Sequence, residues 1–188
     1  MNYYIFGFFL VLFVTGGIAT AETHKLPENS MYHLDSKWKT EDGNVISLSD
    51  LQGDTHIMTM VFTSCEYACP MIISDIHKIT KGLPKKIQKK VRISLFSFDP
   101  EKDTPGVLKK FSTKHMLGSN WNMYTSDEST VRELAAVLGV KYKKMENGMF
   151  GHSNVISIVD SNGVIVHQQN GLYADPAPAI HKIKEQFE

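Results

Sequence analysis

The sequence predicts an α/β fold in which helices flank a mixed central sheet, with a small β-hairpin at the N-terminal side. Three observations support this prediction. Apolar runs of strand length alternate along the chain with segments of helical periodicity. Residues typical of helix starts precede the helical segments, and turn-forming dipeptides separate neighbouring strands. Alternation of strand and helix of this kind is typical of sheets with parallel neighbours.

The first half of the chain supplies a hairpin, a buried strand and a helix. Residues 38–49 contain Asp42-Gly43 between two short runs, and this dipeptide is a strong hairpin-turn signal. Residues 56–62 form a mainly apolar run, which is typical of a buried strand. Residues 69–83 are predicted to be helical because Pro70 suits a first helical turn and isoleucines recur at helical spacing. These isoleucines are Ile72, Ile73, Ile76 and Ile79.

The middle of the chain continues the alternation. Residues 91–98 and 121–124 are predicted strands. Between them, Thr104 is a suitable N-cap and Pro105 a suitable first residue for a helix. Another helix is predicted to begin at residues 127–129.

The C-terminal part is predicted to be a hairpin followed by a helix. Residues 155–159 and 164–167 flank Asn162-Gly163, which favours a tight hairpin turn. Residues 177–187 have the pattern of an amphipathic helix. The resulting order of elements is thioredoxin-like in outline.

The N-terminal segment indicates export. Residues 1–21 contain no charged side chain, and Ala19-Thr20-Ala21 fits the small-residue pattern of a cleavage site, so we expect a signal peptide. The alternative is an uncleaved membrane anchor, because a spanning helix needs about 20 apolar residues. In either case residues 22–188 would form one domain outside the cytoplasm, in the periplasm or tethered to the membrane facing it.

The overall charge argues against nucleic acid as a partner. Lys and Arg number 20 and Asp and Glu number 20, so the formal net charge is zero. Proteins that bind nucleic acid usually carry a basic excess that neutralises phosphates.

The two cysteines, Cys65 and Cys69, are the most informative residues of the chain. They lie four positions apart, between a predicted strand and a predicted helix. This is where an open α/β sheet places its chemistry, at the carboxyl ends of its strands. Two thiols at such a turn either cycle with a disulfide or bind a soft metal.

The spacing leaves both uses open and suits a metal slightly better. Helical residues four apart have Cβ atoms about 5–6 Å apart. A disulfide needs a Cβ separation of about 3.5–4.5 Å, which a loop leading into Pro70 would allow. Metal–sulfur bonds of about 2.3 Å span the wider gap.

Copper is the metal that this donor set favours, if His152 is the third ligand. Two thiolates alone do not complete a zinc site, whereas two thiolates with an imidazole suit copper as Cu(I) or Cu(II). His152 lies in a glycine-containing segment just before residues 155–159, so it is expected at the same end of the sheet as Cys65. The alternative is a loop histidine that bonds only to backbone.

The absence of proline between Pro105 and Pro176 also bears on the function. A thioredoxin places a cis-proline opposite its cysteines, just before the strand that corresponds to residues 155–159. Its absence counts against a general disulfide oxidoreductase and in favour of another use of this segment.

At this point the chain resembles the SCO/SenC family. The resemblance rests on three motifs in order, within about residues 30–188: Thr63-Ser64-Cys65-Glu66-Tyr67-Ala68-Cys69-Pro70, Asp99-Pro100-Glu101-Lys102-Asp103-Thr104-Pro105 and Gly151-His152-Ser153. It implies a thioredoxin-like, exported or membrane-tethered protein that binds copper through Cys65, Cys69 and His152. It also implies a role in assembling the dinuclear copper centre of cytochrome c oxidase.

One residue departs from the family pattern. Many members have proline after the first cysteine, where this chain has Glu66. A carboxylate at this position is expected to raise the pKa of the neighbouring thiol by its charge.

Two functions follow from the same residues. The first is a binding and transfer function, which needs no enzymatic turnover. It is that of a metallochaperone that delivers copper to a subunit of cytochrome c oxidase or to another copper enzyme. The second is a thiol–disulfide reductase that keeps the cysteines of that copper site reduced and is itself reduced by a thiol reductant protein. A peroxidase ranks last, because neither Arg92 nor Arg132 is placed near Cys65 by sequence.

Overall fold

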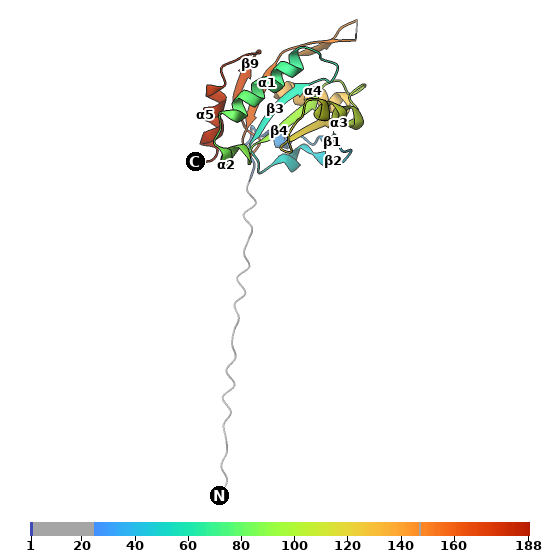
Figure 1. Ribbon diagram of the computed structural model, residues 1–188. Helices are drawn as coiled ribbons and strands as arrows, with labels where there is room; N and C mark the ends of the chain where they lie inside the picture. Colours follow the sequence, from blue (N-terminus) through green and yellow to red (C-terminus); the bar gives the residue numbers. More distant parts are fainter. Residues whose placement is uncertain (2–24, 147) are drawn as a thin grey trace.

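The structure is a computed structural model that describes residue 1 and residues 25–146 and 148–188. It contains a seven-stranded sheet, a separate two-stranded ribbon, α-helices and two short 3-10 helices, η1 and η2 (Figure 1). In chain order the elements are η1 (Met31–His33), β1 (Lys37–Thr40), β2 (Val45–Ser47), η2 (Leu48–Leu51), β3 (His56–Val61), α1 (Ala68–Lys81), α2 (Lys85–Gln88), β4 (Arg92–Ser97), α3 (Pro105–Lys114), β5 (Trp121–Thr125), α4 (Glu128–Val137), β6 (Tyr142–Lys144), β7 (Phe150–His152), β8 (Val155–Val159), β9 (Ile165–Asn170) and α5 (Ala177–Glu185).

The expected signal peptide or anchor, residues 1–21, lies outside the described residues apart from residue 1. Among the described residues, no helix has the length and apolar character needed to cross a membrane.

The central sheet is mixed, as the sequence predicted. Its strand order is β2-β1-β5-β4-β3-β8-β9. The inner strands β3, β4 and β5 run parallel to one another. β8 pairs antiparallel with β3, and β1 pairs antiparallel with β5. The N-terminal hairpin β1–β2 therefore extends the sheet from its β5 side.

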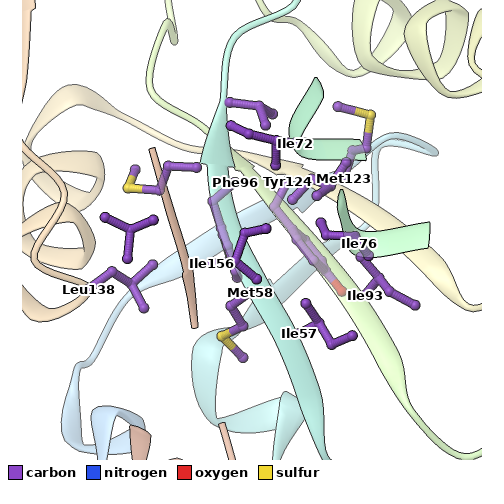
Figure 2. Packing of buried hydrophobic residues seen from close by; sticks show 14 of the residues in the cluster. Ile57, Met58, Ile72, Ile76, Ile93, Phe96, Met123, Tyr124, Leu138 and Ile156 are labelled. Carbon is purple, nitrogen blue, oxygen red and sulfur yellow. The ribbon is translucent and has the colours of Figure 1, made fainter. Parts of the chain in front are cut away.

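The core lies on both faces of β3, whose six residues are all buried. Successive side chains of a strand point to opposite faces, so Ile57 and Met58 enter different layers. Figure 2 shows Ile72 and Ile76 of α1 on one side of β3 and Leu138, which follows α4, on the other. Burial on both sides explains why this segment is a mainly apolar run in the sequence.

The helix ends follow from local sequence. α3 begins at Pro105, as predicted, and α4 begins after Asp127, whose side chain accepts the backbone N–H of Thr130 at 2.9 Å. α1 ends at Gly82, where an added Cβ would lie 2.3 Å from the Cδ1 atom of Ile180. The end of α1 therefore packs closely against α5.

The ribbon β6–β7 is a difference from the prediction. The sequence placed His152 in a loop, whereas the structure places it at the last position of β7, opposite Tyr142 of β6. The segment was missed because β6 is short and rich in lysine. A signal was nevertheless present, since Asn147-Gly148 is a typical hairpin-turn dipeptide.

The topology brings three segments to one edge of the sheet. Parallel strands β3 and β4 end together, with Val61 paired to Ser97. β8 runs in the opposite direction, so its first residue, Val155, lies at the same edge. The segments that contain Cys65, Asp103 and His152 therefore meet there, and we call this the site edge.

Candidate metal centre

Cys65 and Cys69 occupy the turn between β3 and α1. Cys65 precedes the helix and is 9 % exposed, whereas Cys69 is the second residue of α1 and is fully buried. Both are free thiols. The backbone N–H of Cys69 donates to the Sγ atom of Cys65 at 3.4 Å, and the Cys69 thiol lies 3.4 Å from the carbonyl oxygen of Phe62.

These contacts lower the pKa of the Cys65 thiol. A hydrogen bond from the Cys69 thiol is the main cause that lowers the pKa of Cys65 to about 4, and this outweighs the raising effect of burial. Backbone N–H groups of Cys69 and Tyr67 lower that pKa further. They belong to the first turn of α1, where free N–H groups and the helix dipole favour an anion.

Cys69 retains its proton. The hydrogen bond to Cys65 and the burial of the sulfur raise the pKa of Cys69. The two sulfurs therefore differ in acidity, and Cys65, the more accessible of the two, is the more acidic. One sulfur is ready to attack or to bind a metal, and the other must first lose a proton.

His152 lies beside this pair. Its Nδ1 atom is 3.1 Å from the carbonyl oxygen of Ser153. Because a carbonyl can only accept, Nδ1 carries the hydrogen in this contact, and Nε2 is the nitrogen that remains for other partners. The His152 side chain also lies beside Cys65 and is among the groups that lower the pKa of that thiol.

Two aromatic rings fix the position of the His152 ring. The centroid of Phe62 lies 5.7 Å away with the rings nearly perpendicular, and that of Phe98 lies 5.1 Å away. Phe62 and Phe98 follow the neighbouring strands β3 and β4. The core of the sheet thus holds the imidazole at the same edge as the cysteines.

The structure therefore brings together the three residues that the sequence singled out. Their donor set, two sulfurs and one imidazole nitrogen, is chemically suited to copper. In the described part of the chain, however, no group of three His, Cys, Asp or Glu side chains is already arranged to enclose a metal ion.

Asp103 supports the cysteine turn from the next segment of the sheet edge. It is fully buried and accepts the backbone N–H of Thr63 at 3.0 Å and the Thr63 hydroxyl at 2.5 Å. It also accepts the Ser97 hydroxyl at 2.6 Å. Thr63 lies two residues before Cys65, so these bonds fix the start of the turn to the end of β4.

Asp99 has a different environment. It is 1 % exposed, and neither of its carboxylate oxygens has a hydrogen-bond partner among the described residues. Burial, followed by the nearby charge of Asp103, raises the pKa of Asp99. Asp99 lines a cavity of about 340 Å³. Its neighbour Phe98 and residues of the β6–β7 ribbon, such as Tyr142, also line this cavity.

From the sequence, we expect the charge of Glu66 to raise the pKa of the Cys65 thiol, and the structure does not show this effect. The side chain is exposed, and it is not among the groups that shift the pKa of Cys65, which falls rather than rises. Solvent screens the charge of an exposed carboxylate, whereas the hydrogen bonds to Cys65 act directly on its sulfur.

Sequence reasoning also missed part of the site. The aromatic packing around His152 and the bonds from Asp103 to Thr63 depend on contacts between distant segments. The sequence contains one local indication of the aromatic packing, because a phenylalanine ends each of two predicted strands, at Phe62 and at Phe98.

The chain is similar to known proteins of one family. The profile of the SCO1/SenC family matches residues 27–188. The SCO1 protein homolog of Bacillus subtilis (strain 168) is 30% identical over 143 residues, which cover 74% of this chain and 74% of that protein.

Three solved structures share the fold. A SCO1/SenC family lipoprotein from Bacillus anthracis str. Ames is 26% identical with a TM-score of 0.73, covering 81% of this chain and 93% of that chain. BsSco is 29% identical with a TM-score of 0.68, and the match covers 80% of this chain and 90% of that chain. It is described as a member of the Sco family of cytochrome c oxidase assembly proteins and as having a disulfide switch. ScoI of Arabidopsis thaliana, solved with copper bound, is 19% identical with a TM-score of 0.69, and the match covers 80% of this chain and 94% of that chain.

The family profile covers nearly all of the described domain, and the motifs that it spans carry the site. The chain therefore belongs to the SCO1/SenC family.

Proposed function

We propose that this protein binds copper through Cys65, Cys69 and His152 and delivers it to the dinuclear copper centre of cytochrome c oxidase during its assembly. The observation that carries the proposal is the meeting of the Cys65 sulfur, the Cys69 sulfur and the His152 ring at one edge of the sheet. Family membership and the copper-bound relative support the same reading.

The donor set explains how both oxidation states of copper would be held. Thiolate sulfur favours Cu(I), and imidazole nitrogen suits Cu(II) as well. Cys65 offers a thiolate in advance, whereas Cys69 must release its proton when the metal binds. Copper binding should therefore release protons and weaken as the pH falls.

Three ligands also leave the bound ion accessible to an acceptor. Cys65 lies at the surface end of the pair, and its neighbours Ser64, Glu66 and Tyr67 are exposed. A ligand from the copper-receiving subunit, or from another copper enzyme, can thus reach the metal from this side. Delivery of this kind is stoichiometric transfer and needs no catalytic turnover.

The protonation state of the pair favours a second candidate function, the reduction of a disulfide in the target. The Cys65 thiolate would attack one sulfur of that disulfide and form a mixed disulfide, releasing the other target sulfur as a thiolate. Cys69, after passing its proton to the leaving thiolate, would attack Cys65 and release the target in its reduced form. A thiol reductant protein must then reduce the Cys65–Cys69 disulfide.

The place of action follows from the N-terminal sequence. The apolar, uncharged run in residues 1–21 supports export or a membrane tether, so we infer that the domain acts outside the cytoplasm. The lipoprotein nature of the Bacillus anthracis relative is consistent with a tether.

Copper stoichiometry of the reduced protein tests the proposal. The full chain should bind one copper ion, and Cys65→Ser and Cys69→Ser should each abolish tight binding. His181→Ala, which changes an exposed histidine of α5, is the matched control and should bind normally. Full stoichiometry in either cysteine variant would remove the pair from the metal site, and the thiol-reductase function would then be preferred.

A further inference from the structure

The charges of this chain are strongly segregated even though they sum to zero. No Asp or Glu occurs between Asp75 and Asp99, whereas this stretch contains seven Lys and Arg residues. The rest of the sequence has thirteen Lys and Arg against twenty Asp and Glu. Six of the seven cations lie in and around α2, and we call them the lysine face. They are Lys81, Lys85, Lys86, Lys89, Lys90 and Arg92.

The lysines of this face have only uncharged partners among the described residues: Lys85 bonds to Gln88, and Lys90 lies over the Phe187 ring. All five are exposed, and none forms an ion pair in the part of the chain that the structure describes. By contrast, Lys78, Lys109 and Lys144 each pair with a carboxylate. Among the described residues, Asp54 is the acidic residue that contacts this face, and it pairs with Arg92 at 3.2 Å.

The surface beside α2 contains a groove with no acidic residue in its described lining. This groove of about 650 Å³ is lined by Lys81, Lys85, Lys89 and Arg92, with Trp121 and other uncharged residues. Met116 also lines this groove and is 86 % exposed, which is unusual for a large apolar side chain. A surface that combines free lysines with an exposed apolar side chain suits a membrane interface.

The lysine face lies at the edge of the sheet opposite the site edge. Arg92 is the first residue of β4 and pairs with His56, the first residue of β3. Each of these strands has six residues, so about 20 Å separates their two ends. Cys65 follows the far end of β3. A partner bound at the lysine face would therefore leave the cysteines uncovered.

The chain also joins the domain at this same edge. The backbone N–H of Met31 donates to the carbonyl oxygen of Gly163, and the Ser30 hydroxyl donates to that of Asn162. These residues follow Val159, the last residue of β8, which pairs with His56. The segment that leads back to the apolar residues 5–18 of the sequence thus meets the domain beside the lysine face.

We propose that the lysine face binds the surface of a membrane that contains anionic phospholipids and orients the domain with Cys65 and Cys69 directed away from the bilayer. Charge alone would suit an acidic protein equally well, but the exposed Met116 and the position of the N-terminal segment both favour lipid. Each lysine near an anionic surface strengthens binding about fivefold. The proposal does not depend on copper binding, and its test uses no metal.

The test is lysine acetylation of the full chain reconstituted into vesicles, read residue by residue by mass spectrometry. Because the N-terminal segment is present in every arm, a comparison of vesicle compositions isolates the lysine face. At low salt, vesicles of phosphatidylcholine with 30 % phosphatidylglycerol should slow acetylation of Lys85, Lys86, Lys89 and Lys90 at least fivefold relative to pure phosphatidylcholine. The protection should disappear at 0.5 M NaCl.

Two charge-matched variants sharpen the test, with Lys81 as the reporter residue. Changing Lys85, Lys86, Lys89 and Lys90 together to Gln should abolish the protection of Lys81. Changing Lys39, Lys110, Lys141 and Lys143 together to Gln removes the same charge from exposed positions elsewhere and should preserve it. Equal acetylation on both kinds of vesicle would overturn the proposal. Protection by soluble poly-glutamate but not by the anionic vesicles would also overturn it and would assign the face to an acidic protein.

Discussion

The backbone N–H of Cys69 points at the sulfur of Cys65 across 3.4 Å, so the second cysteine stabilises the anion of the first. The interaction between the two side chains also lowers the pKa of Cys65 and raises that of Cys69, which gives the pair unequal acidity. This relationship depends on the four-residue spacing, which places Cys65 before the helix and Cys69 within its first turn.

Alkylation rates should reveal this asymmetry. With the pKa of Cys65 lowered to about 4, its thiolate fraction is already complete at pH 6. We expect iodoacetamide to modify Cys65 before Cys69, at a rate nearly constant between pH 6 and pH 8. An ordinary thiol with a pKa of about 8.5 reacts roughly tenfold faster for each pH unit in this range. Peptide mapping by mass spectrometry checks the order, and a tenfold rise per pH unit at Cys65 would contradict the assignment.

Asp103→Ala should loosen the cysteine turn and destabilise the domain. The change removes the acceptor of three hydrogen bonds and leaves the backbone N–H of Thr63 without its partner. The expected loss in the free energy of unfolding is about 3 kcal/mol, since a buried unsatisfied donor costs about 1–3 kcal/mol in addition to the lost bonds. Urea denaturation measures it. Asp127→Ala, which removes an exposed cap of α4, is the control and should cost clearly less. Equal losses in the two variants would show that Asp103 has no special role.

His56 should make the domain less stable in acid. It is 2 % exposed, and burial lowers its pKa to about 4, while an unfolded histidine titrates near pH 6.5. Between these values the unfolded state binds a proton that the folded state does not. This contribution is therefore complete above pH 6.5 and is lost as the pH falls to about 4, by about 3 kcal/mol in total.

The variant His56→Gln separates this effect from the titration of carboxylates. Unfolding free energies measured at pH 7.5 and pH 4.5 should differ less in the variant than in the unchanged protein, by about 2.5 kcal/mol. Identical pH dependence in the two proteins would show that His56 titrates normally in the folded state.

Gly163 should tolerate substitution much less well than Gly43, although both have a positive φ, of 80° and 86°. A Cβ at Gly163 would lie 2.5 Å from the Tyr32 ring and 2.7 Å from the Ser30 hydroxyl, whereas a Cβ at Gly43 meets nothing within 4 Å. Gly43→Ala should cost about 1 kcal/mol from backbone strain alone. Gly163→Ala should cost more than about 3 kcal/mol because overpacking adds to the strain. Thermal unfolding of both variants checks the difference, and equal losses would contradict the close contact.

Most of the fold could be predicted because its signals are local. The apolar run of β3, the Pro105 start of α3 and the Asn162-Gly163 turn each specify an element from neighbouring residues alone. The prediction failed for β6 and β7, which have three residues each and whose pairing with each other carries little apolar pattern. It also failed for α2, a four-residue helix rich in lysine.

The candidate site was predictable in its residues but not in its chemistry. The spacing of Cys65 and Cys69 and the place of His152 before β8 were sufficient to bring the three side chains to one edge. The unequal acidity of the two cysteines depends on atomic distances at the start of α1. The support from Asp103 depends on a contact between residues 40 positions apart in the sequence. Neither is encoded in a local pattern.

X-ray absorption at the copper edge tests the central claim most directly, because it reports the atoms bound to the metal. The full chain loaded with Cu(II) should show two sulfur ligands and at least one imidazole nitrogen. His152→Ala should lose the imidazole scattering and keep both sulfurs, whereas His181→Ala should give the unchanged spectrum. An unaltered imidazole signal in His152→Ala would contradict the proposed metal centre.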